Sequence, residues 1–61
     1  MDLGKIIAFN LNKLRTERSL TLGQLAKLSG ISKAILSDIE KGGSNPTINT
    51  IWKIANGLNV P

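Results

Sequence analysis

The chain has 61 residues, lacks cysteine and histidine, and carries eight lysines and arginines against four acidic residues, for a formal charge of +4. A chain of this length folds as one domain with a small core, which argues against a deep catalytic cleft. The missing cysteine and histidine argue against disulfides and transition-metal sites, whereas the positive charge favours a polyanionic partner such as nucleic acid.

No apolar run approaches the roughly 20 residues that span a bilayer, and the N-terminus lacks the pattern of a signal peptide. We therefore expect a cytoplasmic protein with no membrane partner and no cofactor.

Residues 1–18 are predicted to form a first helix. Asp2 is a suitable cap, and Ile7, Leu11 and Leu14 recur at helical spacing along one apolar stripe. Arg15 lies beside this stripe, where a guanidinium cannot be buried cheaply without a carboxylate partner. Glu40 is the predicted partner. In the alternative, Arg15 contacts phosphate and Glu40 lies in solvent.

Residues 21–41 are predicted to form two short helices joined by a tight turn. Thr21 and Gln24 have the spacing of a capping box, and Gly30 can adopt the left-handed conformation that closes the first of these helices. Ser32 is a candidate cap for the second, which is predicted to reach Glu40 or Lys41. Ala26 and Gly30 are small enough for the two helices to approach closely. This pattern predicts a helix-turn-helix, and the alternative is a helical hairpin that does not bind nucleic acid.

A loop follows over residues 41–46, and Thr47 is predicted to cap a fourth helix that ends near Gly57. Trp52 is predicted to lie in the core or at its edge. Neither a repeat nor an internal linker is evident, so the sequence predicts one all-α domain. We do not expect an enzyme, because the only close acids, Asp38 and Glu40, lie on different sides of their helix.

Five short motifs form a set that is specific as a whole: Leu14-Arg15, Leu25-Ala26, Gly30-Ile31-Ser32, Ile39-Glu40-Lys41-Gly42 and Asn45-Pro46-Thr47. Together they resemble the XRE family, the helix-turn-helix proteins of phage repressor and Cro type. The runs ISKAILSDIEKG and SNPTINTIWKIANGLNVP are most similar to the DNA-binding domain of XRE-cupin transcriptional regulators. The resemblance implies a compact four- to five-helix, lambda-repressor-like DNA-binding domain over residues 1–61, as the N-terminal part of a longer regulator.

The resemblance also implies two sets of DNA-contacting residues. The outward side of the third helix matches the family's base-reading positions, which fall here on Ser32, Lys33, Ala34, Ser37 and Asp38. Phosphate contacts are expected at the flanks of this helix, from Thr21, Gln24, Lys41, Gly42, Gly43, Ser44 and Asn45.

The implied function is sequence-specific binding of double-stranded DNA by a transcriptional regulator, with repression as the expected outcome. The expected partners are a palindromic operator, a second copy in a full-length homodimer, and a small-molecule effector bound by a domain absent from this chain. The alternative is an antitoxin or another protein-binding module on the same fold.

Overall fold

A computed structural model describes residues 2–60, and it contains four helices and no strand in that range. The helices are α1 (Leu3–Glu17), α2 (Leu22–Ser29), α3 (Lys33–Glu40) and α4 (Ile48–Leu58). The predicted all-α class is therefore confirmed. The predicted start of the first helix at Met1 lies outside the described residues. Over the same range, no helix is long and apolar enough to cross a membrane.

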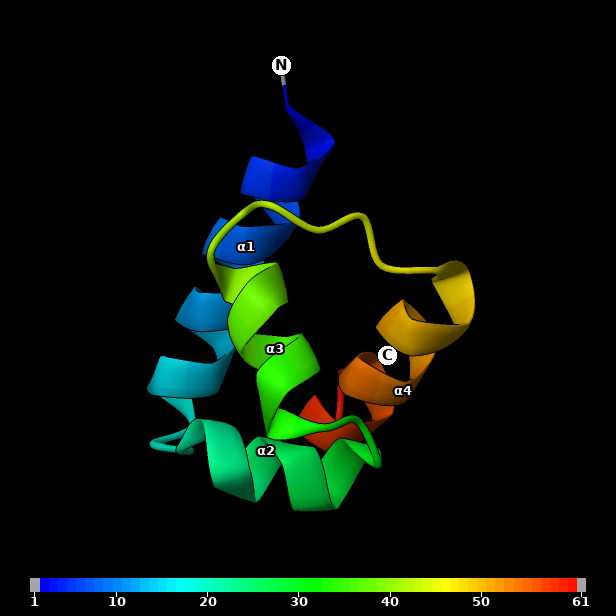
Figure 1. The fold of residues 1–61 in the computed structure, drawn as a ribbon. Helices are drawn as coiled ribbons and strands as arrows, with labels where there is room; N and C mark the ends of the chain where they lie inside the picture. Colours follow the sequence, from blue (N-terminus) through cyan, green and yellow to red (C-terminus); the bar gives the residue numbers. More distant parts are fainter. Residues whose placement is uncertain (1, 61) are drawn as a thin grey trace.

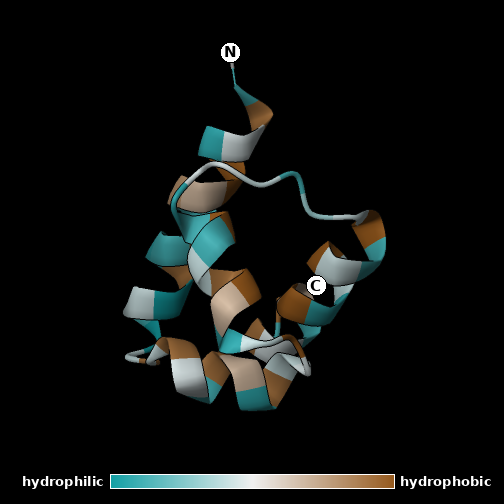
Figure 2. Cartoon of the chain, viewed as in Figure 1, coloured by the Kyte–Doolittle hydropathy of each residue, from teal (hydrophilic) through white to brown (hydrophobic). Residues whose placement is uncertain are grey.

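The helices surround one apolar core. α3 packs against α1, and α2 packs against both α3 and α4. In Figure 1, α2 crosses below the ends of α1 and α3, and the loop after α3 passes over to α4. Apolar and hydrophilic residues alternate along every helix (Figure 2), as expected for helices with one buried side. The buried side chains that form the core cluster are Leu11, Leu25, Leu36, Ile39, Ile54 and Leu58.

The helix starts follow from local hydrogen bonds that the sequence predicted. The Asp2 carboxylate accepts a hydrogen bond from the backbone N–H of Gly4 at 2.9 Å. The hydroxyl of Thr47 accepts one from the N–H of Thr50 at 3.1 Å. Each cap satisfies a backbone donor that the first helical turn leaves without a partner.

The end of α4 differs from the prediction. The helix continues through Gly57 to Leu58, and Asn59 rather than Gly57 adopts the left-handed conformation, with φ 59°. A Cβ on Gly57 would lie 3.0 Å from the Cβ and 3.1 Å from the backbone N of Ser29. Gly57 is therefore the residue that allows α4 to approach α2 closely, and the extension of the helix to Leu58 places that side chain in the core one turn after Ile54.

The prediction for Trp52 was wrong, because its side chain is 63% exposed. The buried stripe of α4 runs through Ile54 and Leu58. A residue two positions before Ile54 lies on the opposite side of a helix with 3.6 residues per turn. Trp52 is therefore a surface residue of α4.

Candidate nucleic-acid interface

The helix-turn-helix formed by α2 and α3 is held by short-range hydrogen bonds. The Thr21 hydroxyl accepts from the N–H of Gln24 at 3.1 Å, and the Gln24 side-chain oxygen accepts from the N–H of Thr21 at 2.8 Å, which confirms the predicted capping box. Gly30 closes α2 with φ 75° and donates its N–H to the carbonyl of Ala26 at 2.9 Å. Ser32 then caps α3 by accepting from the N–H of Ile35 at 3.1 Å.

Gly30 is needed for its backbone conformation and not for close packing, which corrects the prediction. A Cβ at this position would meet no heavy atom within 4 Å. A φ of +75° is costly for residues with a Cβ but readily adopted by glycine. Ala26 is half-buried and packs against the core, as a small residue in α2 was expected to do.

One side of α3 is anchored in the core. Leu36 and Ile39 are fully buried and contact the cluster formed by the other helices. This anchoring determines which residues face outward, because side chains on the remaining part of a two-turn helix must point away from the core. Lys33, Ala34 and Asp38 are exposed on that outward side.

The five residues predicted to read bases therefore lie on or beside the free surface of α3, with two qualifications. Ser37 is only half-exposed. Ser32 is exposed, but its hydroxyl oxygen already accepts the capping hydrogen bond from Ile35. The hydroxyl proton of Ser32 remains available as a donor.

Ile35 is a surface residue of α3 that the predicted set left out. Its side chain is 49% exposed, although it is large and apolar. Its sequence spacing made it intermediate between the buried and the outward positions. The extent of its exposure depends on how α3 sits against the other helices.

The residues predicted to contact phosphate lie at both ends of α3 and at the start of α2. Thr21 and Gln24 are exposed, and the capping box leaves the Thr21 hydroxyl proton and the Gln24 amide NH₂ as outward donors. Beyond α3, the exposed members of the set are Lys41, Gly43 and Asn45, whereas Gly42 and Ser44 are half-buried.

The predicted donor at Gly42 requires a correction. Its N–H donates to the carbonyl of Ile39 at 3.0 Å, so this group closes α3 and is not free for a phosphate. A Cβ on Gly42 would lie 3.5 Å from Cγ of Lys5. The fold thus brings an exposed lysine of α1 beside the loop after α3, a neighbour that the sequence did not indicate.

An ion pair holds the end of α3 against α1, as predicted. Nε of Arg15 lies 2.7 Å from Oε2 of Glu40, and its Nη2 donates to Oε1 at 3.0 Å. Nη1 of Arg15 also donates to the carbonyl of Leu20 at 2.7 Å. The side chains of Arg15 and Glu40 are only 15% and 11% exposed, which rules out the alternative in which Arg15 contacts phosphate and Glu40 lies in solvent.

Asn12 completes this network, and no pattern in the sequence indicated its part in it. Its Nδ2 donates to Oε1 of Glu40 at 2.9 Å. The hydrogen bond from Arg15, opposed by burial and assisted by Asn12, lowers the pKa of Glu40 below its ordinary value. The same bond raises the pKa of Arg15, against the effect of its burial. Both groups therefore stay ionised and keep α3 fixed relative to α1.

The chemistry of this surface is that of hydrogen-bond donation and positive charge. Lysines, hydroxyls and the amides of Gln24 and Asn45 lie on and around α3, beside the exposed carboxylate of Asp38, and the donors among them bind phosphate oxygens and base edges. Among residues 2–60, no group of three or more His, Cys, Asp or Glu side chains could hold a metal ion.

Comparison with known proteins places this arrangement among helix-turn-helix proteins. The HTH_3 family model, described as helix-turn-helix, matches residues 11–61. The HTH-type transcriptional regulator SutR of Escherichia coli K12 is 47% identical over 60 residues, which cover 98% of this chain and 34% of that protein.

Two solved structures share the fold. An HTH_3 family transcriptional regulator from Vibrio cholerae is 50% identical and superimposes with a TM-score of 0.93, over 95% of this chain and 33% of that one. The wild-type restriction-modification controller protein C.Esp1396I is 31% identical, with a TM-score of 0.93, over 100% of this chain and 78% of that one. The chain thus spans about a third of the length of the first two relatives and most of the third.

Proposed function

The chain belongs to the HTH_3 family of helix-turn-helix proteins, and on that basis we propose that it binds double-stranded DNA in a sequence-specific manner as a transcriptional regulator. The observation that carries this proposal is the geometry of α3. Its buried side is anchored by Leu36 and Ile39, its end is tied to α1 by the pair of Arg15 and Glu40, and its outward side is free. A helix presented in this way fits the major groove. Relatives named as regulators support this role over an enzymatic one, and such a protein would act in the cytoplasm.

We assign base readout to the outward residues of α3. Lys33 can donate to guanine O6 and N7, and the methyl group of Ala34 suits contact with a thymine methyl. Asp38 can accept from cytosine N4. The hydroxyls of Ser32 and Ser37 can bind either a base or a phosphate.

Phosphate binding is assigned to the two flanks of α3. Thr21 and Gln24 contribute their remaining donors at the start of α2. At the other flank the contributing residues are Lys41, Gly43, Ser44 and Asn45, with Gly42 supporting the loop. Neutralising about three or four phosphates per domain would give a slope of roughly −3 to −4 in a plot of log affinity against log salt.

A single domain of this size makes few contacts, so we propose that two copies bind a palindromic operator with half-sites about 34 Å apart. Repression by blocking a promoter is the proposed outcome. On the resemblance to XRE-cupin regulators, we propose that a small-molecule effector, bound by a further domain, controls this repression.

The test is an amide chemical-shift titration with the palindromic duplex nearest the gene, beside a scrambled duplex at the same salt concentration. We expect amides from Ser32 to Asp38 to shift more with the palindrome, and those of Thr21 and Gly43 to shift with both duplexes. If no amide of α3 shifts with any duplex, the function as a DNA-binding protein is wrong, and the antitoxin or protein-binding alternative takes its place.

A further inference from the structure

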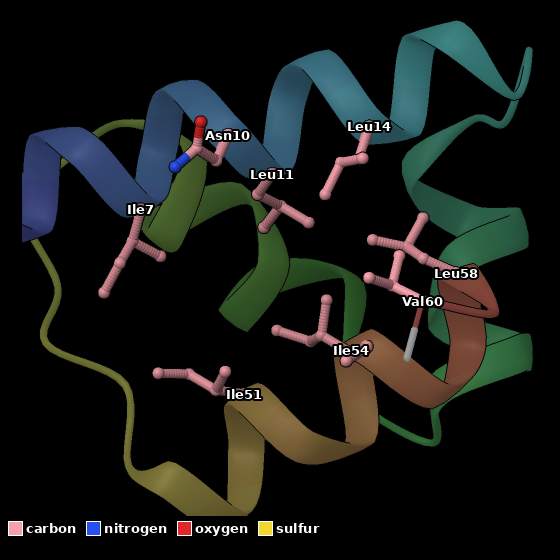
Figure 3. Close-up of a pocket in the computed structure, with 9 residues that line it drawn as sticks. Ile7, Asn10, Leu11, Leu14, Ile51, Ile54, Leu58 and Val60 are labelled. Atoms are coloured by element: carbon pink, nitrogen blue, oxygen red, sulfur yellow. The ribbon is translucent and has the colours of Figure 1, made fainter.

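Two sides of α1 are left partly uncovered by the other helices, and they differ in character. One side borders an apolar groove of about 190 Å³, with Ile7 and Leu14 of α1 on one wall and Ile51 of α4 on the other (Figure 3). The other side borders the end of α3 and the loop that follows it. It carries Lys5 and Phe9, which are both exposed and which we call the α1 flank.

Lys5 is held beside the loop after α3. The start of α1 packs tightly on this loop, because a Cβ on the buried Gly4 would lie 3.1 Å from the carbonyl oxygen of Gly42 and 3.3 Å from that of Ser44. A Cβ on Gly42 would lie 3.5 Å from Cγ of Lys5. The stem of Lys5 therefore lies against the loop, next to the residues assigned to phosphate at this end of α3.

No acid neutralises the charge of Lys5 within residues 2–60, where this lysine forms no ion pair. Glu40, the acid that ends α3, is already paired with Arg15 at 2.7 Å. The carboxylate of Asp2 is engaged as the cap of α1. Lys5 and Lys41 therefore place two positive charges at this end of α3, where an anionic ligand would be attracted.

Phe9 lies on the same side of α1 as Lys5. It follows Lys5 by four positions and precedes Asn12 by three, and these spacings place side chains on one face of a helix. Lys5 contacts the loop at Gly42. Asn12 donates to Glu40 at 2.9 Å. Phe9 is thus located between two contacts with the end of α3, about 6 Å along the helix axis from Lys5, and its side chain is 68% exposed.

A cation and an apolar ring one helical turn apart match the chemistry of a nucleic-acid backbone. In that backbone each phosphate is joined to a sugar, which presents apolar C–H groups. A protein partner fits less well, because lysine is depleted in protein interfaces, whereas two lysines lie beside this ring.

We propose that the α1 flank makes a further contact with the DNA backbone, in which the ammonium group of Lys5 binds a phosphate and the ring of Phe9 packs on the adjoining deoxyribose. The inference rests on the proposed function, and it adds α1 to the elements that contact DNA there. Phosphates and sugars are alike in every nucleotide, so this contact strengthens binding to all sequences and reads no base.

Salt-dependent fluorescence anisotropy with the scrambled duplex tests the contact, because a backbone contact does not require the operator. Each neutralised phosphate contributes about 0.9 to the salt slope. Lys5→Ala should lose this contribution, so that the ratio of wild-type to variant affinity falls about 3.5-fold between about 50 and 200 mM salt. Lys5→Arg should keep the wild-type slope. Phe9→Ala should weaken binding about fivefold at every salt concentration, as expected when about 40 Å² of apolar area is no longer buried.

Lys53→Ala is the matched control, because it removes the same charge from an exposed position on α4, to which no DNA contact is assigned. Its slope and affinity should equal those of the wild type. Circular dichroism establishes that all variants are folded.

Equal salt slopes for Lys5→Ala and Lys53→Ala would overturn the phosphate contact. Wild-type affinity in Phe9→Ala would overturn the sugar contact and leave the ring as a site for a protein partner. In either case, shifts of the α3 amides in the wild-type titration would keep the proposed function intact. A wild-type chain that binds neither duplex at the lowest salt concentration would overturn both the proposed function and this inference.

Discussion

Replacing Glu40 with glutamine removes the negative charge that Arg15 contacts while preserving the shape of the side chain. Hydrogen bonds to charged groups contribute about 1.5–3 kcal/mol, and removing one partner of a buried pair costs about 3–5 kcal/mol. The glutamine keeps one acceptor oxygen, and the native side chains retain 15% and 11% exposure to water. We therefore expect Glu40→Gln to lower the free energy of unfolding by about 2 kcal/mol, near the lower end of these values.

Thermal unfolding followed by circular dichroism measures this change. In a domain of 60–100 residues, 1 kcal/mol corresponds to roughly 4–8 °C in Tm, so Glu40→Gln should lower the Tm by about 10 °C at neutral pH. Asp38→Asn is the control, because it removes an exposed acid of the same helix that forms no ion pair among the described residues. Its Tm should stay close to that of the wild type.

The pH dependence of the Tm difference between the wild type and Glu40→Gln gives a second test of the ion pair. The pKa of Glu40 is lowered in the folded state, so its contribution to stability is fully present above the ordinary glutamate pKa and is lost as the pH falls through the folded-state pKa. The Tm of the wild type should then approach that of Glu40→Gln in acid. The role of the ion pair in holding α3 would be refuted by either of two results. One is a Tm of Glu40→Gln equal to that of the wild type at neutral pH, and the other is a Tm difference that does not shrink in acid.

Four further variants test the readout and the packing. Lys33→Ala should cost about 1–3 kcal/mol of binding free energy on the operator and relax the preference at one base pair; equal losses on every duplex would remove Lys33 from the readout set. Lys41→Ala should weaken binding to all sequences and reduce the salt slope by about one, as measured by fluorescence anisotropy at several salt concentrations. Gly57→Ala should destabilise the fold by about 1–3 kcal/mol, because its Cβ would press on Ser29. Gly23→Ala, where the Cβ has only one neighbour at 3.9 Å, should instead raise the Tm; a rise for both alanine variants would contradict the close approach at Gly57.

Features that depend on neighbours in the chain were predictable from the sequence. The capping box of Thr21 and Gln24, the left-handed Gly30 and the cap at Ser32 each involve residues within four positions of one another. The burial of Leu36 and Ile39 follows from helical periodicity. The pairing of Arg15 with Glu40 is the exception, because these residues lie on different helices; it was predicted since a guanidinium beside an apolar stripe requires a carboxylate.

The tertiary structure alone decided where one helix meets another. Gly57 was read as a helix end by its local sequence, but it lies against Ser29 of α2, 28 positions away in the chain. Trp52 was predicted to lie in the core or at its edge, yet it is exposed on α4, whose buried side packs against α2.

The surface of the molecule shows the same contrast between features set by the local sequence and features set by helix packing. The sequence determined the all-α class, the helix-turn-helix and the outward residues of α3, because these follow from hydrogen bonds and periodicity within one or two helical turns. The approach of Lys5 to the loop at Gly42, the hydrogen bond from Asn12 to Glu40 and the open groove between α1 and α4 depend on how separate helices pack. Packing minimises exposed apolar area over the whole chain at once, so no local pattern specifies which side of α1 or α4 remains uncovered.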